Sequence, residues 1–259
     1  MHGEGGKPMP RFFVTTEQID NGLIVISGDD AFHISRALRM AAGEHITACD
    51  ENGLEYDCIL ERFDPDSVTA RILTSEASSS EPPFFAHVFQ GLPKGDKLET
   101  VIQKAVECGA SAITPFESEF CIARSKPEAE EKRTERRRRI AAEAAKQCGR
   151  AILPEVNPTV PFNVMLEQAK AFDLVIFCYE GEGTLPLGRA ISELDSAVRE
   201  GKRPRVAIIV GSEGGFSEKE ALAAKNAGLS LCGLGKRILR TETAATFVLC
   251  CAVCATELS

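Results

Sequence analysis

Two polar segments of the chain have the composition of a ligand site. Residues 211–217 read Gly-Ser-Glu-Gly-Gly-Phe-Ser and follow the apolar run 205–210. Residues 234–246 combine a glycine, cations, an acid and hydroxyl side chains, and they follow a second apolar run, 229–234. If both runs are parallel strands, both segments lie at the carboxyl ends of strands, where open α/β sheets bind ligands. The two segments therefore predict a site for a polar ligand.

The glycine-rich segment differs from a phosphate-binding loop. Its glycines permit close approach of the backbone, and Ser217 with Glu220 predicts a capping box at the start of a helix. However, the segment lacks the Lys-Ser/Thr end of a P-loop and the spacing of a dinucleotide fingerprint. Glu213 would also repel a phosphate. The composition favours a ligand such as an adenosine or a sulfonium cation, and the structural alternative is a tight turn with an incidental glutamate.

Strand and helix patterns alternate from residue 84 onward and would position both segments. The expected strands are 85–90, 111–116, 173–178, 205–210 and 229–234. The expected helices begin with a capping box of Asp96 and Glu99 and continue with residues 128–148, 187–199, 217–228 and 244–255, the last capped by Thr241 or Thr243. This alternation predicts a largely parallel sheet with helices on both faces.

The preceding residues predict a separate β-rich domain. Short strand patterns are broken by the turn signals Asn52-Gly53 and Asp64-Pro65-Asp66, and Asp29 and Asp30 are expected to cap a short helix. Closely spaced strands of this kind suggest a small barrel. We expect three parts: a barrel at 9–76, a linker at 77–83 and an α/β domain at 84–259.

Composition narrows the class of protein. With 44% hydrophobic and 26% charged residues, the chain of 259 residues is typical of globular proteins, and it has no apolar run long enough to span a membrane. Its first ten residues lack the apolar core of a secretory signal, and residues 1–8 resemble a leader. We therefore expect a cytoplasmic protein whose ten cysteines are reduced, with Cys251-x-x-Cys254 as buried small hydrophobic residues of the last helix and no metal site.

The distribution of charge matters more than the net charge of −8, which taken alone argues against a nucleic-acid partner. Between Arg124 and Arg150 there are ten Lys or Arg residues and five Glu residues. This run either tracks phosphates or is a solvated helix face. An acidic body with one basic face stays compatible with RNA.

The two polar segments, read together, resemble the ribosomal small subunit methyltransferase E family. The resemblance rests on Gly211-Ser-Glu-Gly-Gly-Phe216 and on Leu234-Gly-x-Arg-Ile-Leu-Arg-x-Glu-Thr-Ala244. Many members have proline where this chain has Ser212, which affects backbone stiffness more than chemistry. Further matching segments are 9–13, 33–40, 94–97, 103–104, 107–109, 113–115 and 143–150.

The resemblance implies a fold, a reaction and a cofactor. Family members methylate N3 of a uridine in 16S ribosomal RNA and belong to the SPOUT superfamily, so the resemblance implies an N-terminal PUA-like barrel, an α/β domain with a deep trefoil knot, and a homodimer. It also implies an S-adenosylmethionine site built from three loops. Carried over, that site comprises Phe177, Tyr179, Glu180, Gly181, Val210, Gly211, Glu213, Gly214, Gly215, Leu234, Gly235, Ile238, Leu239, Arg240, Thr243 and Ala244.

Two side chains of the second segment are candidates for the chemistry. N3 of uridine is a poor nucleophile while protonated, and a cation near O2 or O4 would stabilise the developing anion. We assign that role to Arg240. Glu242 is a candidate base, although a carboxylate at a helix start also fits a cap or an acceptor for adenosine. The expected RNA contacts are Arg11, Arg36, Arg39, Arg136, Lys146 and Arg150, whose alternative role is surface solubility.

Three other functions compete with this interpretation. One is a SPOUT methyltransferase that acts on tRNA or on a ribose 2′-oxygen. Another is an RNA-binding assembly factor that retains the fold without activity. The third, an enzyme that binds nucleotide phosphates, is weakened by the missing P-loop lysine.

Overall fold

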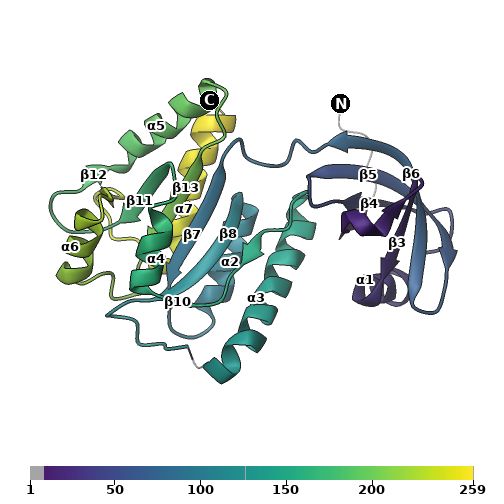
Figure 1. Ribbon diagram of the computed structural model, residues 1–259, viewed down its shortest axis with the longest axis horizontal. Helices are drawn as coiled ribbons and strands as arrows, with labels where there is room; N and C mark the ends of the chain where they lie inside the picture. The colour runs from purple at the N-terminus through teal and green to yellow at the C-terminus, as the bar shows by residue number, and fades with distance from the viewer. Residues whose placement is uncertain (1–8, 126, 259) are drawn as a thin grey trace. The chain divides into compact units, whose positions relative to one another are not determined.

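The computed structural model describes residues 9–125 and 127–258 and divides the chain into two units (Figure 1). The first unit comprises the chain up to Glu81 together with Ala145–Leu153. The second comprises Pro82–Ala144 and the chain from Pro154 onward. The suggested leader at residues 1–8 lies outside the described residues.

The first unit is built on a six-stranded sheet. The strands run in the order β1 (Arg11–Phe13), β4 (His45–Cys49), β5 (Leu54–Phe63), β6 (Ser67–Ala77), β3 (Leu23–Ser27) and β2 (Ile19–Asp20). Only the β1–β4 pairing is parallel among these. A short turn η1 (Thr16–Gln18), helix α1 (Gly28–Phe32) and the π-helical turn η2 (His33–Ala37) complete the unit.

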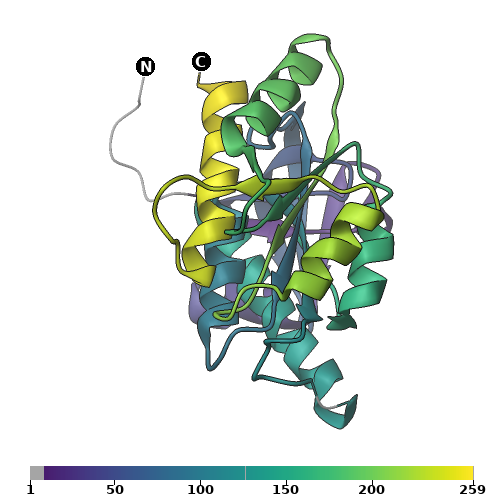
Figure 2. The same ribbon diagram turned by 90° about the vertical axis from the view of Figure 1, so that its left-hand side faces the viewer.

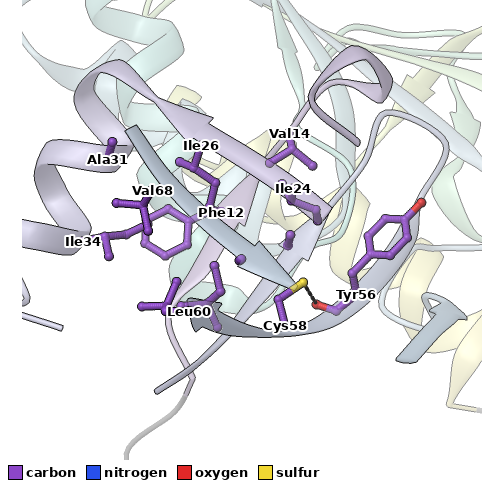
Figure 3. Packing of buried hydrophobic residues seen from close by; sticks show 13 residues of the cluster. Phe12, Val14, Ile24, Ile26, Ala31, Ile34, Tyr56, Cys58, Leu60 and Val68 are labelled. Atoms are coloured by element: carbon purple, nitrogen blue, oxygen red, sulfur yellow. Dashed lines mark hydrogen bonds between the residues drawn. The ribbon is translucent and has the colours of Figure 1, made fainter. Parts of the chain in front are cut away.

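The core of the first unit lies on one face of this sheet. Along β3, Ile24 and Ile26 are buried and the intervening Val25 is 43% exposed, which is the alternation of a half-buried strand. Figure 3 shows these side chains converging with Phe12 and Ile34. Each large apolar side chain buried in this way stabilises the fold by about 1.5–3 kcal/mol.

Turn chemistry fixes the ends of these strands as the sequence predicts. The carboxylate of Asp50 accepts hydrogen bonds from the amides of Asn52 (2.9 Å) and Leu54 (3.0 Å), and Gly53 has a φ of +79°. The predicted hairpin is thereby confirmed. The predicted caps Asp29 and Asp30 are wrong, because Ser27 is the N-cap and both aspartates lie inside the first turn of α1.

A buried carboxylate fixes the end of the segment Ala145–Leu153 to the first unit. Glu81 accepts hydrogen bonds from the guanidinium of Arg150, at 2.6 Å, and from the amides of Ala151 and Ile152, at 3.0 and 3.1 Å. The side chains of Arg150 and Glu81 are 5% and 9% exposed. A buried ion pair with this many hydrogen bonds is costly to break, because either partner alone would be an uncompensated charge.

The second unit is an α/β domain with a parallel sheet, as the alternation of patterns predicts. Its main path is β10 (Val160–Pro161), β8 (Ala110–Glu117), β7 (Phe85–Gly91), β13 (Arg205–Val210), β11 (Leu174–Cys178), β14 (Leu231–Gly233) and β12 (Leu185–Pro186), with β9 (Glu155–Val156) beside β8. All pairings of these strands are parallel. The run Val206–Val210 is buried throughout, as expected of a strand covered on both faces.

Helices cover both faces of this sheet, as Figure 2 shows. On one side lie α2 (Lys97–Glu107), α5 (Leu187–Arg199) and α7 (Thr241–Glu257), which pack on one another. On the other lie α4 (Phe162–Ala169) and α6 (Glu218–Asn226), which pack with Phe residues of the strands. The remaining helix of the domain is α3 (Pro127–Cys148). Among the described residues, no helix is long and apolar enough to cross a bilayer.

Two details of the helices correct the sequence predictions. Helix α7 is buried along one stripe that includes Ala245 and Leu249. Cys254 is exposed and Cys251 is half-buried, so the prediction that both are buried small hydrophobic residues is wrong for Cys254. The helix covers one face of the sheet and therefore needs only one buried stripe. At α2, Asp96 is the N-cap, but the predicted capping box is wrong: the Asp96 side chain makes no cap, and the Glu99 carboxylate accepts from Arg136.

Candidate functional site

Three loops at the carboxyl edge of the parallel sheet enclose a cavity of about 690 Å³. They follow β11, β13 and β14, which are neighbours in the sheet. The lining residues are Lys97, 178–181, Thr184, 210–216, 233–242 and Ala244. Both segments that the sequence singles out are therefore brought together, and the loop after β11 joins them.

Glycines are required in these loops because other parts of the chain pass close to them. A Cβ atom on Gly211 would lie 2.9 Å from the carbonyl carbon of Gly215. A Cβ on Gly214 would lie 2.7 Å from the Cβ of Phe120. Side chains at either position would force the loop open, so the glycine-rich sequence sets the shape of the cavity wall.

The loop after β13 is fixed to the start of α7 by buried polar groups. The hydroxyl of Thr241 donates to the carbonyl oxygen of Gly211 at 2.6 Å and accepts from Nε2 of Gln90 at 2.8 Å. The predicted cap at Thr241 or Thr243 is wrong, because Arg240 is the N-cap and makes no side-chain cap. The Thr241 hydroxyl is directed at another loop instead, while the predicted capping box of Ser217 and Glu220 is confirmed.

A cation that the sequence reasoning did not select lies between two acids of the cavity. The ammonium of Lys97 lies 2.8 Å from the Glu213 carboxylate and 4.0 Å from that of Glu242. Burial raises the pKa of Glu213, but the hydrogen bonds from Lys97 and backbone amides outweigh it and lower that pKa. The negative charge of Glu213 is thus balanced within the cavity wall. The sequence signal for Lys97 was the segment 94–97, which is among those that resemble the family.

The cavity leaves polar atoms available to a ligand. Within the described part of the chain, Oγ of Ser212 and Oε2 of Glu242 are buried and have no hydrogen-bond partner. Native structures rarely leave such atoms unpaired. Together with backbone groups of the glycine-rich loop and the apolar Val210 and Leu239, they suit a ligand with an adenosine and a charged group. These polar and apolar groups together therefore fit S-adenosylmethionine.

Most of the predicted cofactor residues line this cavity, and two do not. Phe177 is wholly buried within β11, where its ring packs 4.3 Å from that of Phe216. Thr243 is exposed on α7 and does not line the cavity. The residues that do line it are Tyr179, Glu180, Gly181, Val210, Gly211, Glu213, Gly214, Gly215, Leu234, Gly235, Ile238, Leu239, Arg240 and Ala244.

Comparison with known proteins identifies the family. The model of an RNA methyltransferase domain matches residues 80–253, and that of an RNA methyltransferase PUA domain matches residues 26–73. The ribosomal RNA small subunit methyltransferase E of Bacillus subtilis is 34% identical over 96% of this chain and 98% of its own length. The chain belongs to the ribosomal RNA small subunit methyltransferase E family. A member from Mycobacterium bovis is 28% identical over 92% of this chain and 88% of its own length.

A solved member of the methyltransferase E family shares the fold. The enzyme from Neisseria gonorrhoeae, whose structure has S-adenosyl methionine bound, is 29% identical and covers 95% of this chain and 97% of its own, with a TM-score of 0.78. The first unit is accordingly PUA-like and the second is the methyltransferase domain. Among the described residues, no group of three His, Cys, Asp or Glu side chains is arranged to hold a metal ion.

In the PUA-like unit of this methyltransferase E chain, two of the predicted RNA contacts are free to meet a ligand. Arg36 lies in the turn η2 and Arg39 just after it, and both are exposed. Within the described residues, neither side chain has a hydrogen bond or an ion pair. Arg39 has a φ of +55°, and Phe32, the last residue of α1, is 65% exposed. The strained backbone and the exposed ring favour an interaction surface here.

The other predicted RNA contacts are occupied within the protein. Arg11 donates to Glu55 at 2.9 Å and Lys146 pairs with Asp30 at 2.8 Å. Arg150 is buried with Glu81, so it fixes the chain and is removed from the expected RNA surface. Arg136 is 67% exposed and pairs with Glu99, which leaves its other donors toward solvent. Sequence reasoning could not find these partners because they come from distant parts of the chain.

Proposed function

We propose that this protein transfers a methyl group from S-adenosylmethionine to N3 of a specific uridine in the 16S ribosomal RNA of the small subunit. The observation that supports it most is the cavity whose wall carries Arg240 and Glu242 at the start of α7. The relatives named as small subunit methyltransferases support the RNA substrate. A ribosomal substrate implies a cytoplasmic protein.

The cofactor would be held by the cavity-lining residues of the three loops. Backbone groups of Gly211–Gly215 and of the segment 178–181 would take its adenosine, and the free atoms of Ser212 and Glu242 would accept or donate hydrogen bonds. When bound, S-adenosylmethionine supplies an electrophilic methyl carbon. Backbone contacts preorganised in this way bind without reorganising at the moment of reaction.

Arg240 is assigned to the developing uridine anion. Its side chain is exposed at the cavity, and in the described part of the chain it makes no hydrogen bond or ion pair. Loss of the N3 proton places negative charge on O2 and O4, and a guanidinium donor there lowers the barrier. The free donors of Arg240 therefore suit a substrate that arrives from solvent.

Glu242 is assigned to ligand positioning. Its Oε2 lies 4.0 Å from the Lys97 ammonium and at the N-terminus of α7, both of which stabilise a negative charge. The same atom has no hydrogen-bond partner among described residues, so accepting a bond from the bound ligand is the better-supported role.

RNA would be held by the PUA-like domain at 9–76, and the domain at 84–259 would carry out the transfer, with 77–83 as the linker. Arg36 and Arg39 would neutralise phosphates. Arg11, Arg136 and Lys146 would bind RNA only if it displaced the carboxylates with which they now pair. The homodimer and the trefoil knot that the family resemblance implies stay predictions.

The deciding experiment is methyl transfer from labelled S-adenosylmethionine to small ribosomal subunits that lack the modification. The expected product is N3-methyluridine at one position, mapped by mass spectrometry of the digested RNA. Fully modified subunits are the matched control and should accept no methyl group. A methyl group on a ribose or on tRNA would favour another RNA methyltransferase, and cofactor binding without transfer to any RNA would favour an assembly factor.

A further inference from the structure

Phe120 presents an exposed aromatic ring beside the cavity. It is 46% exposed, and it lies in the loop between β8 and α3. Its Cβ packs against the backbone of Gly214, a lining residue of the cavity, so closely that no side chain could stand there. An exposed aromatic ring beside a ligand cavity is a surface on which a nucleobase can stack.

Hydrogen bonds on both sides of Phe120 hold its backbone in place. The amide of Cys121 donates to the carbonyl of Ser118 at 3.2 Å, which closes a tight turn. The amide of Glu119 donates to the Glu220 carboxylate at 2.8 Å. Ser118 and Cys121 are themselves buried. The ring is therefore displayed from a fixed turn and not from a loose loop, which lowers the entropy lost when it binds.

Glu220 connects this turn to the wall of the cavity. One of its oxygens accepts from Glu119 and the other accepts from the amide of Ser217, at 3.0 Å, in the capping box of α6. The side chain is only 7% exposed. The glycine-rich loop and the Phe120 turn are thus positioned by one buried carboxylate.

A cation accompanies the ring. The guanidinium of Arg124, which is about half exposed, donates to the carbonyl of Ser118 at 2.9 Å and lies 3.8 Å from the Glu117 carboxylate. The loop therefore offers an aromatic face with a positive charge a few residues away. This pairing is typical of sites for single-stranded nucleotides, in which bases stack on rings and cations meet the phosphates.

We propose that Phe120 is the stacking platform for the extruded pyrimidine base that accepts the methyl group. This inference rests on the proposed function and adds a positioning residue to it. Stacking engages the face of the base and leaves its N3 edge free to approach the cavity. Enzymes that act on a base commonly hold it between aromatic or apolar side chains after it leaves the stack.

Steady-state kinetics on unmodified small subunits separate stacking from packing. Phe120→Ala and Phe120→Leu should each lower kcat/KM for the subunit by about tenfold to a hundredfold, whereas Phe120→Tyr should stay near the wild-type value. Leucine retains apolar contact with Gly214, so a normal rate for Phe120→Leu would overturn the proposal. The Kd for S-adenosylmethionine should stay unchanged in all three variants. Weakened cofactor binding would instead mean that the ring only supports the loop.

A direct test uses fluorescence, because the natural chain contains no tryptophan. Phe120→Trp introduces a single reporter, and Ile122→Trp, on the same loop at a residue that is 71% exposed, is the matched control. Short oligouridylate RNA should quench the first reporter more than an abasic RNA of the same length does, and should quench the second equally with both. Equal quenching of Phe120→Trp by the two RNAs would contradict stacking, as would an emission already blue-shifted in the free protein.

The two tests also distinguish this inference from the proposed function. If the wild-type protein makes N3-methyluridine and Phe120→Ala does so equally well, the stacking inference fails and the function stands. If quenching still depends on the base but the methyl group is found on another atom, the stacking inference holds and the proposed function fails.

Discussion

Arg240 gives the sharpest prediction at the scale of single residues. Arg240→Ala should lower kcat on unmodified small subunits by roughly a hundredfold to a thousandfold, because it removes a donor to the developing anion. The Kd for S-adenosylmethionine, measured by calorimetry, should change little. Arg237→Ala removes a neighbouring cation of the same cavity and is the control, expected to leave kcat within a few-fold. Similar losses of kcat in both variants would mean that the total positive charge of the cavity matters, and not a specific contact of Arg240.

A substitution of Glu242 distinguishes a role as general base from a role as hydrogen-bond acceptor for the ligand. Glu242→Gln keeps the size of the side chain and removes its charge. We expect a higher Kd for S-adenosylmethionine, by about tenfold or less, with an unchanged pH profile of kcat at saturating cofactor. A large fall in kcat with normal cofactor affinity would restore the assignment as general base.

Single residues were predictable from the sequence where their partners are near in the chain. The Ser217–Glu220 capping box and the glycine turns follow from local chemistry. Lys97 was missed because its partner Glu213 is 116 positions away in the sequence. Phe177 does not line the cavity because it lies inside β11, which ends at Cys178, and is buried there together with Ile176.

At the scale of elements, Thr241 fixes the start of α7 to the end of β13. Thr241→Val preserves shape and leaves the carbonyl of Gly211 and the amide of Gln90 without this partner. We expect a loss of about 1–3 kcal/mol in the free energy of unfolding, measured by denaturant titration. Thr243→Val, on the exposed side of the same helix, is the control and should be nearly neutral. The prediction fails if the two variants are equally stable.

The turn η2 and its flank give the prediction for RNA affinity. The double variant Arg36→Ala/Arg39→Ala should weaken binding of ribosomal RNA and reduce the slope of log Kd against log salt by about two, since two phosphate contacts are lost. Arg62→Ala, a solvent-exposed arginine of the same unit, should leave the slope unchanged. An unaltered slope in the double variant would mean that both arginines serve solubility.

The types of most elements could be read from the sequence, and their partners could not. The runs 85–90 and 205–210 match β7 and β13 closely, because buried parallel strands are continuous apolar runs. Helix α7 was predicted less well, because Cys254 was expected to be a small hydrophobic residue of the core and is exposed. Small apolar residues do not reveal which side of a helix meets the sheet.

At the scale of the whole molecule, His87 gives a prediction for acid stability. Burial and the charge of Arg205 lower the pKa of His87 to about 4. Because this is below the ordinary value of about 6.5, the unfolded state binds more protons in this window, and stability is lost as pH falls from about 6.5 toward 4. The free energy of unfolding should be about 2 kcal/mol lower at pH 5 than at pH 7 from this group alone.

His87→Phe tests this origin by denaturant titration at both pH values. The variant should show a smaller difference between pH 7 and pH 5. Thr114, which contacts Nε2 of His87 at 2.7 Å, keeps a hydrogen bond from Asn157 at 3.1 Å, so its hydroxyl is not orphaned. The same pH difference in the variant and the wild type would assign acid sensitivity to other groups.

The bond between Glu81 and Arg150 has a consequence for how this protein can be divided. A gene fragment that stops after residue 81 would encode every strand of the first unit but would lack Ala145–Leu153. Its terminal carboxylate-bearing side chain would then have neither guanidinium nor amides to accept from. The PUA-like unit therefore cannot be separated intact from this protein by a single cut in the sequence. A portable version would need residues 145–153 grafted back as a second piece.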